Sequence, residues 1–428
     1  MSLNARTVCA CLAIGVAMVA CGSDADPAGG TAGAGGKAGS AGVGDAGSGG
    51  DAGASGATDA VSRADVVKTY AENLAAGYDD AVQDEKDFKE VVEAFLADPS
   101  EKKLASARSA WLASREHYML TEGARFYDGP IDVDPPNNEG LVNSWPLDEA
   151  YIDYTTTLDA NGDPVVDDSV GIINMPSVLE NITAEGLDEL NAAGSDENIS
   201  AGYHAVEFLL WGQALEEVGP GERPASDYDV DGPRPNADRR AKYLTVAIDG
   251  IITHLQDVAD AWKPSAEYRV GFEAAPNESL TKIFTGLAKF SKGELAGERI
   301  RAAYKSKERH DQHNCFSSST LTDYTRDAIG IQNMYLGKYR DHDGPGLDDL
   351  VRAVDPAEDA KLQKLLQASV DAVKAIPEPF EEAIAGADSS PGRKAILAAI
   401  NALSAQGDEF GIAADKLGLS ITVDDPEE

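Results

Sequence analysis

One histidine and one glutamate stand three residues apart in an apolar segment of the sequence, at His204 and Glu207. On a helix they would share one face, a single turn apart, and their apolar neighbours imply that this face is withdrawn from water. Neutral imidazole and carboxylate are both ligands for zinc, iron and copper ions. Considered alone, a pair at this spacing is more often a hydrogen bond within a helix. A metal site would also need ligands from elsewhere in the chain.

Two glycines and two aromatic residues surround this pair and favour a functional site. Gly202 and Gly212 bracket the motif, and a glycine inside a helix costs about 1 kcal/mol relative to alanine. Their presence suggests that another helix or a ligand approaches the backbone closely. The polar atoms of Tyr203 and Trp211 also need partners if these side chains are buried.

Three other segments place ionisable side chains next to aromatic ones, and each offers a candidate for a further ligand. These candidates, among which the sequence sets no order, are Glu122, Asp148 and His313. Glu122 could instead form an ion pair with Arg115 or Arg125. Asp148 could simply cap a loop.

The N-terminus has the pattern of a bacterial lipoprotein signal. A short apolar run, residues 7–20, follows Arg6 and is too short to span a membrane as a mature helix. It ends in Met-Val-Ala-Cys, which resembles a lipobox and predicts lipidation of Cys21 after cleavage. Gly22 comes next rather than aspartate, which favours the outer membrane, facing the periplasm. A plain secretory signal cleaved nearby is the alternative.

The mature chain would then consist of a tether and a folded part with a single thiol. Residues 22–58 are rich in glycine, alanine and serine and are expected to form a disordered tether. Cys315 is the cysteine left after processing, so no intramolecular disulfide can form. Next to Phe316 it is more typical of a small buried apolar side chain than of a nucleophile.

The charge of the chain excludes one class of partner. With 74 acidic and 36 basic residues, the formal net charge is -38. Nucleic-acid binding needs clustered positive charge, so this class is excluded. The acidic field would attract a cation, although acidic surfaces also serve solubility.

Apolar residues recur at helical spacing along most of the chain from about residue 59. Helices are expected in the ranges 62–74, 84–96, 100–118, 200–215, 239–262, 280–290, 294–307, 322–336, 358–375 and 391–417. No sustained alternation of apolar and polar residues predicts a long strand. Residues 128–168 are rich in proline, asparagine, aspartate and glycine and are expected to form a long structured loop.

This pattern predicts an all-α fold of two successive antiparallel bundles. The folded part would cover residues 59–424, with a first bundle at about 59–230 and a second at about 236–424. The boundary falls in the breaker-rich segment 219–235. A weak similarity between residues 121–132 and 320–330 suggests that the bundles arose by duplication.

Several separated motifs resemble the imelysin family, also called the M75 peptidase or iron-regulated protein A family. The family's GxHxxE motif corresponds to Gly202 through Glu207. The other matching segments, in the same order as in the family, are 111–125, 139–141, 145–148, 239–244, 293–299 and 313–320. The resemblance implies a helical fold of two related bundles, an extracytoplasmic location, a link to iron acquisition, and a metal-facing role for His204 and Glu207.

The segment around His313 departs from the family's pattern. The family usually shows Glu-His-Ser-Cys-Phe-Ser-Asp-Asn-Thr there, whereas this chain has Gln312 and Ser318 at the two acidic positions. A role that needs carboxylates at these positions is therefore not expected. His313 and Cys315 are kept.

Three functions follow as hypotheses. The first is a metal-binding lipoprotein of the cell envelope that takes part in iron uptake or homeostasis through the GxHxxE motif. It would bind iron, or zinc as the alternative, or an iron-containing ligand, and would work with envelope iron-uptake proteins. The second is a metallopeptidase with Glu207 as general base, but the zinc-peptidase motif His-Glu-x-x-His is incomplete, so enzymatic activity is left open. The third is a non-enzymatic module that binds haem or a partner protein.

Overall fold

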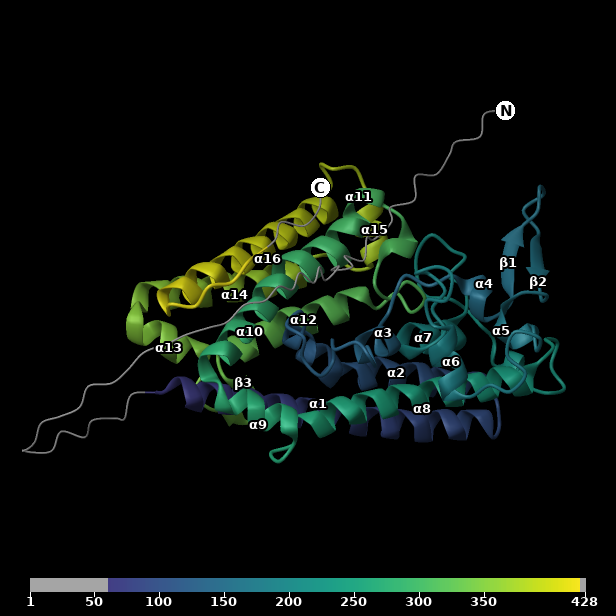
Figure 1. Ribbon diagram of the computed structural model, residues 1–428. Coiled ribbons are helices and arrows are strands. Elements are labelled where there is room, and N and C mark those ends of the chain that lie inside the picture. Colours follow the sequence, from purple (N-terminus) through teal and green to yellow (C-terminus); the bar gives the residue numbers. More distant parts are fainter. Residues whose placement is uncertain (1–60, 424–428) are drawn as a thin grey trace, which may run out of the picture. The chain divides into compact units, whose positions relative to one another are not determined.

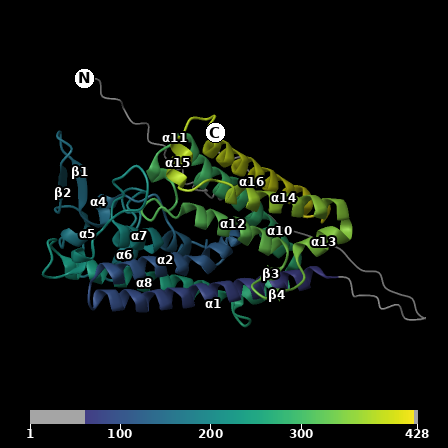
Figure 2. The same cartoon turned by 180° about the vertical axis from the view of Figure 1, so that it is seen from behind.

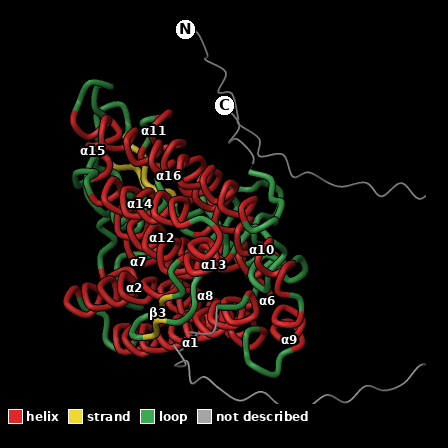
Figure 3. Tube along the Cα trace, turned by 90° about the vertical axis from the view of Figure 1, so that its left-hand side faces the viewer, coloured by secondary structure: helices red, strands yellow, loops and turns green. Residues whose placement is uncertain are grey.

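Helices form most of the regular structure of residues 61–423, the part of the chain that the computed structural model describes. The longer helices are α1 (Arg63–Leu96), α2 (Glu101–Thr121), α7 (Gly202–Trp211), α8 (Ala237–Ala261), α9 (Glu267–Ala274), α10 (Pro276–Lys289), α12 (Thr320–Tyr335), α13 (Leu347–Val354), α14 (Pro356–Lys374) and α16 (Pro391–Lys416). Figure 3 shows that red helices dominate the described chain. The predicted all-α class is therefore confirmed.

Short helices and two hairpins complete these residues. The short α-helices are α3 (Asn138–Val142), α4 (Glu149–Ile152), α5 (Gly171–Asn174), α6 (Ala184–Leu190), α11 (Ala302–Ser306) and α15 (Phe380–Ala385). The 3-10 helices are η1 (Glu122–Ala124), η2 (Ala225–Tyr228) and η4 (Arg309–Asp311), and η3 (Phe290–Arg301) is a π-helix. The strands are β1 (Thr155–Leu158), β2 (Pro164–Asp167), β3 (Lys338–Tyr339) and β4 (His342–Asp343).

The first helix begins at Arg63, one residue after the predicted start at residue 62, and Ser62 is its N-cap. The Ser62 side chain accepts a hydrogen bond from the Asp65 backbone, and the Asp65 side chain accepts one from the Ser62 backbone. This reciprocal arrangement is a capping box, which satisfies two otherwise unpaired backbone donors. One face of α1 then packs against α2 and α8, and it is buried because apolar residues recur along it.

The helix α12 lies between two groups of helices. It packs against α2 on one side and α14 on the other, while α14 and η3 both pack against α16. Figure 1 shows α14 and α16 on one side of α12, and α1, α2 and α8 on the other. At the crossing of α2 and α12, a Cβ on Gly330 would lie 2.5 Å from the Leu120 carbonyl oxygen, so glycine permits this close approach.

The predicted helices at 280–290 and 294–307 are joined in the structure. The helix α10 continues directly into the π-helix η3 and then into α11. A π-helix has one extra residue per hydrogen-bonded turn and is frequent at functional sites. Here it carries Arg299, which is fully buried and forms an ion pair with Glu122 of η1.

Both hairpins are antiparallel and short. In the first, Thr155 pairs with Asp167 and Leu158 with Pro164; in the second, Tyr339 pairs with His342. Figure 2 shows β1 and β2 beside α4 and α5, and β3 and β4 beside α1 and α13. The predicted loop 128–168 thus contains α3, α4 and the first hairpin.

The structure covers only some of the segments predicted from the sequence. The signal sequence, Cys21 and the tether 22–58 lie outside the described residues, so they stay predictions. The helix α8 follows the predicted boundary at 219–235 and packs against α1 from the first part of the chain. Within residues 61–423, no helix combines the length and apolar character needed to cross a membrane.

Candidate metal centre

The predicted motif forms the helix α7, and all ten of its residues are buried. It begins at Gly202, whose φ of +83° lies in the left-handed region. A Cβ at this position would lie 2.5 Å from the carbonyl oxygen of Val142, the last residue of α3. The close backbone approach expected at this glycine is therefore made by the chain itself.

Replacing Gly202 by alanine is expected to lower the free energy of unfolding by about 2–3 kcal/mol, because it combines a strained φ with a backbone clash. Chemical denaturation would measure this loss. Gly250→Ala on α8 is the matched control, since a Cβ there meets nothing within 4 Å. Equal effects at the two glycines would contradict the close approach at Gly202.

His204 and Glu207 form a buried hydrogen bond. His204 Nδ1 lies 3.2 Å from Glu207 Oε2, and the two side chains are 2% and 0% exposed. The other carboxylate oxygen, Oε1, accepts a hydrogen bond from the Ser317 backbone N–H at 2.7 Å. Burial raises the pKa of Glu207 to about 7, against the effect of the Ser317 hydrogen bond. Glu207 therefore orients the imidazole and uses both of its oxygens within the protein.

The third predicted candidate, His313, lies directly against His204. The two ring centroids are 4.7 Å apart with an interplanar angle of 72°. His313 Nδ1 lies 3.2 Å from Asp323 Oδ2, and the Trp145 ring packs edge-on against His313 at 5.5 Å. The structure therefore brings together two histidines that are remote in sequence, each with its own carboxylate.

Asp323 is held by further hydrogen bonds from two residues. Its Oδ2 atom accepts hydrogen bonds from Arg115 Nε at 3.0 Å, Arg115 Nη2 at 2.6 Å and Asn314 Nδ2 at 2.7 Å. Because the arginine and the amide hold this carboxylate in place, its orientation towards His313 is also fixed.

Both imidazoles are neutral and have one free nitrogen. Burial lowers the pKa of His204 well below its ordinary value, and the Arg115 charge adds to this effect. Burial also lowers the pKa of His313, and the Arg299 charge acts in the same direction. Neither Nε2 atom has a hydrogen-bond partner among the described residues. Since Nδ1 of each ring faces a carboxylate, each Nε2 is left as a lone-pair donor, the arrangement typical of metal-binding histidines.

The chemistry of the two unpartnered Nε2 atoms fits a metal cation, because imidazole nitrogen is a common metal ligand. Asn314 Oδ1 is a further buried acceptor without a partner on the same segment, and it is a candidate oxygen ligand. Within residues 61–423, no group of three or more His, Cys, Asp or Glu side chains is arranged to hold a metal ion. The two imidazoles and their carboxylates thus form the candidate metal centre, named the histidine pair below.

The remaining predicted candidates lie in other surroundings. Glu122 is buried in η1, but its Oε2 atom binds Arg299 Nη2, and Arg125 lies 3.8 Å away. Asp148 is exposed and caps α4 by accepting a hydrogen bond from Ala150 N at 3.0 Å. The structure therefore unites His204, Glu207 and His313, leaves Glu122 in a neighbouring ion-pair cluster, and gives Asp148 a capping role.

The departures around His313 have local structural explanations. The Gln312 Oε1 atom accepts a hydrogen bond from the Thr320 hydroxyl at 3.2 Å, and the Ser318 hydroxyl donates to Glu381. Burial raises the pKa of the Cys315 thiol well above its ordinary value, which disfavours the reactive thiolate. Neither Gln312 nor Ser318 contacts the imidazoles through these bonds.

A cluster of buried ion pairs surrounds Arg299 close to the histidine pair. Arg299 Nη1 binds Asp327 Oδ2 at 3.0 Å, its Nε binds Glu294 Oε1 at 2.9 Å, and its Nη2 binds Glu122. Arg125 also contacts Glu294, at 3.6 Å. The cluster links α12, η3 and η1, so one guanidinium connects three segments far apart in the sequence.

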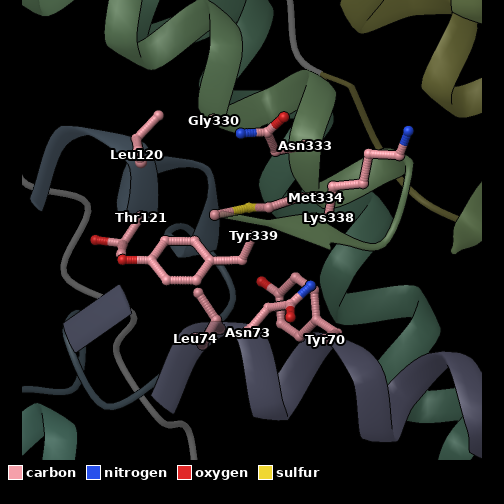
Figure 4. A pocket seen from close by; sticks show the side chains of 10 residues that line it. All are labelled: Tyr70, Asn73, Leu74, Leu120, Thr121, Gly330, Asn333, Met334, Lys338 and Tyr339. Carbon is pink, nitrogen blue, oxygen red and sulfur yellow. The ribbon is translucent and has the colours of Figure 1, made fainter. Parts of the chain in front are cut away.

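A separate small cavity of about 20 Å³ lies between α1, the end of α2, α12 and β3. Figure 4 shows the Tyr339 ring between Met334 on one side and Leu74 and Tyr70 on the other. This volume is close to the minimum that accommodates one water molecule. The cavity is therefore too small for an organic ligand.

Comparisons with known proteins agree with this architecture. Residues 74–410 match the model of the imelysin family, peptidase M75. The chain is 24% identical over 326 residues to iron-regulated protein A of Synechococcus elongatus, covering 75% of this chain and 76% of that protein. It also matches the crystal structure of a protein assigned as an iron-regulated protein A precursor from Parabacteroides distasonis, with a TM-score of 0.61, 18% identity and coverage of 83% of this chain and 94% of the other. The family match spans most of the chain, so this protein belongs to the imelysin family.

Proposed function

We propose that this protein binds a transition-metal cation through His204 Nε2 and His313 Nε2, and that it serves iron uptake or homeostasis at the cell envelope. The observation that carries the proposal is the histidine pair itself. Two buried neutral imidazoles lie 4.7 Å apart, each oriented by a carboxylate and each with an unpartnered Nε2. An unpartnered polar atom in a protein interior is costly, and a metal ion would satisfy both nitrogens.

Iron is the favoured cation, with zinc as the alternative. Imidazole nitrogen suits iron, zinc and copper alike, so the two donors do not select among them. The choice of iron rests on the two relatives, both named as iron-regulated protein A. An iron-containing small ligand would use the same nitrogens, and envelope iron-uptake proteins are the proposed partners.

The contacts of the histidine pair favour cation binding over peptide hydrolysis and over haem binding by both histidines. A general base for peptide hydrolysis must reach a water molecule next to the substrate, yet Glu207 is 0% exposed and both of its oxygens already accept hydrogen bonds. Two axial histidines of a haem must lie on opposite faces of the porphyrin. The edge-to-face contact of His204 and His313 at 4.7 Å leaves no room for a ring between them.

Direct cation titration tests the proposal. The purified mature chain is titrated with Fe²⁺ under anaerobic conditions and with Zn²⁺, and bound metal is measured after equilibrium dialysis. One tightly bound cation per chain is expected, together with its loss in the double variant His204→Ala/His313→Ala. Equal metal content in wild type and double variant would overturn the proposal.

The proposed location follows from the lipobox at Cys21. Cys21→Ser is expected to abolish lipid attachment and to shift the protein from the membrane fraction. Labelling with radioactive palmitate and fractionation of cells would measure both effects. Cys315→Ser is the control and should keep the label, because its thiol lies in the folded part. A Cys21→Ser protein that still carries the label would contradict the proposed anchor.

A further inference from the structure

The unpartnered polar atoms around the histidine pair are of two kinds. The two Nε2 atoms and Asn314 Oδ1 carry lone pairs, which a cation would satisfy. Arg115 Nη1 and Asn143 Nδ2 are N–H donors, and they too lack a hydrogen-bond partner among the described residues. Both side chains are 1% exposed. Buried polar groups are nearly always paired, and a cation cannot pair with an N–H group, so the two donors need a second ligand.

Direct contacts join these atoms into one cluster around Asp323. Arg115 Nη2 and Asn314 Nδ2 donate to Asp323 Oδ2 at 2.6 and 2.7 Å. His313 Nδ1 lies 3.2 Å from the same oxygen. Arg115 Nη2 also donates to Asn143 Oδ1 at 3.2 Å. The donors and the acceptors without partners therefore lie on residues that contact one another.

The residues on either side of Asn143 touch both segments that carry the histidines. Asn143 follows the last residue of α3. The carbonyl oxygen of the preceding residue, Val142, faces the start of α7 at Gly202. Two residues after Asn143, the Trp145 ring packs against His313 at a centroid distance of 5.5 Å. Asn143 is thus held next to the histidine pair by its own backbone.

The shape of the guanidinium directs its unpaired hydrogen towards the side of Asn143. Nε and Nη2 of Arg115 bind Asp323, and Nη2 also binds Asn143 Oδ1. In the planar fork, one Nη1 hydrogen runs parallel to the Nη2 hydrogen that faces the amide. Trp111 and Tyr203 contact the guanidinium through their rings, at 5.1 and 4.6 Å, and a ring offers no lone pair to this hydrogen.

We propose that Arg115 Nη1 and Asn143 Nδ2 bind a small planar oxyanion, a carboxylate or carbonate, that enters together with the cation of the histidine pair. This inference rests on the proposed function and names the class of its second ligand. A planar anion offers two oxygens to neighbouring N–H groups, the arrangement in which arginine binds carboxylates. Free carbonate and the carboxylate of an organic iron chelate present this same chemistry.

The balance of charge favours the same combination of ions. Arg115 and Asp323 carry opposite charges and bind each other. Among the described side chains in contact with the two imidazoles, Glu207 is then left to offset a cation. A divalent cation would exceed that single negative charge, and an uncompensated buried charge is costly. A monovalent anion at Arg115 and Asn143 would cancel the excess.

Titration of the full mature chain with Zn²⁺ in different anions tests this inference. Bicarbonate or acetate is added to a carbonate-free chloride buffer at fixed pH and ionic strength, with free Zn²⁺ corrected for binding to the anion. Either anion is expected to raise Zn²⁺ affinity by about 10- to 100-fold, the range for hydrogen bonds to a charged group. Comparison of the two separates carbonate from an organic carboxylate. With the ¹³C-labelled anion, NMR should show a bound signal that requires Zn²⁺.

Two substitutions of Asn143 have different expected results. Asn143→Leu removes the donor at similar volume, so the anion should no longer raise the affinity. Asn143→Asp places a fixed carboxylate next to Arg115, so tight Zn²⁺ binding should need no added anion. Asn138→Leu is the matched control on α3 and should keep the anion effect. Asn138 is also buried, but its amide already donates to the Pro130 carbonyl oxygen at 3.3 Å.

The outcomes separate this inference from the proposed function. If wild type binds no Zn²⁺ in any anion, the proposed function fails and the anion site fails with it. If wild type binds Zn²⁺ equally well in chloride, acetate and bicarbonate, the anion site is overturned while the cation site stands, and water satisfies the two donors. A bound ¹³C signal that does not need Zn²⁺ would contradict the joint entry of the two ions. The NMR measurement uses wild type, so it decides even if a variant fails to fold.

Discussion

Replacing either His204 or His313 by alanine is expected to weaken Zn²⁺ or Fe²⁺ binding by more than 100-fold. Loss of an outer carboxylate partner of a metal-bound histidine typically costs about 10- to 100-fold in affinity, and loss of the nitrogen donor itself should exceed this range. Competition with a chromophoric chelator would measure the dissociation constants. The decisive variant is His313→Ala, because His313 lies outside the motif that contains His204.

Two comparisons make this prediction specific. His117→Ala removes a histidine that binds Asp84 near the surface, and its affinity should equal that of wild type. Asp323→Asn should show a smaller loss than His313→Ala, because the amide still holds the ring but with less negative charge. If His313→Ala kept wild-type affinity, His313 would not be a ligand, and the proposed site of two histidines would be contradicted.

Replacing Arg299 by methionine is expected to lower the free energy of unfolding by about 3–5 kcal/mol at neutral pH, since it leaves buried carboxylates without their counter-charge. Three acids bind this guanidinium: Glu122, Glu294 and Asp327. Chemical denaturation followed by circular dichroism would measure the loss.

The matched control is Arg326→Met, the neighbouring position to Asp327 on α12. Arg326 binds Glu116 at 3.0 Å, and the two side chains are 34% and 45% exposed. Exposed pairs of this kind contribute about 1 kcal/mol or less, so this variant should unfold almost as wild type does. Adding Asp327→Asn to Arg299→Met should recover part of the loss, because it removes one stranded charge. Similar stabilities of Arg299→Met and Arg326→Met would show that the ion-pair cluster does not support the fold.

The helices could be predicted from the sequence because their determinants are local. Ser62 and Asp65 cap α1 within one turn, and apolar residues at helical spacing mark the buried face of each long helix. The continuous run of α10, η3 and α11 is harder to predict from the sequence. A π-helix differs from an α-helix only in which backbone groups are joined by hydrogen bonds. The strands β1 and β2 form a single hairpin. Each strand is too short to show a clear alternation of apolar and polar residues in the sequence.

The candidate site is only partly predictable from the sequence, because tertiary contacts bring His313 and Asp323 to His204 and Glu207. His204 and Glu207 lie one helical turn apart, so their pairing follows from spacing alone. Ser317, whose backbone N–H completes the contacts of Glu207, lies 110 residues further along the chain. Asp323 carries no motif signal, and the only hint in the sequence is an acid on the buried face of a predicted helix, which is unusual. The sequence allows Arg115 as an ion-pair partner of Glu122, but Arg115 binds Asp323 instead.

The burial of the histidine pair has a consequence for the speed of metal exchange. His204 and His313 are each 2% exposed, and their Nε2 atoms are shut off from bulk water. A cation would reach these nitrogens only during a transient opening of the surrounding segments. The Trp145 ring, which packs against His313 and is partly exposed, belongs to these segments. Uptake would then saturate at the opening rate, and a chelator could extract the metal no faster than the same opening allows. Such a protein would act as a slow-exchange store of its cation, in contrast to a rapidly equilibrating buffer.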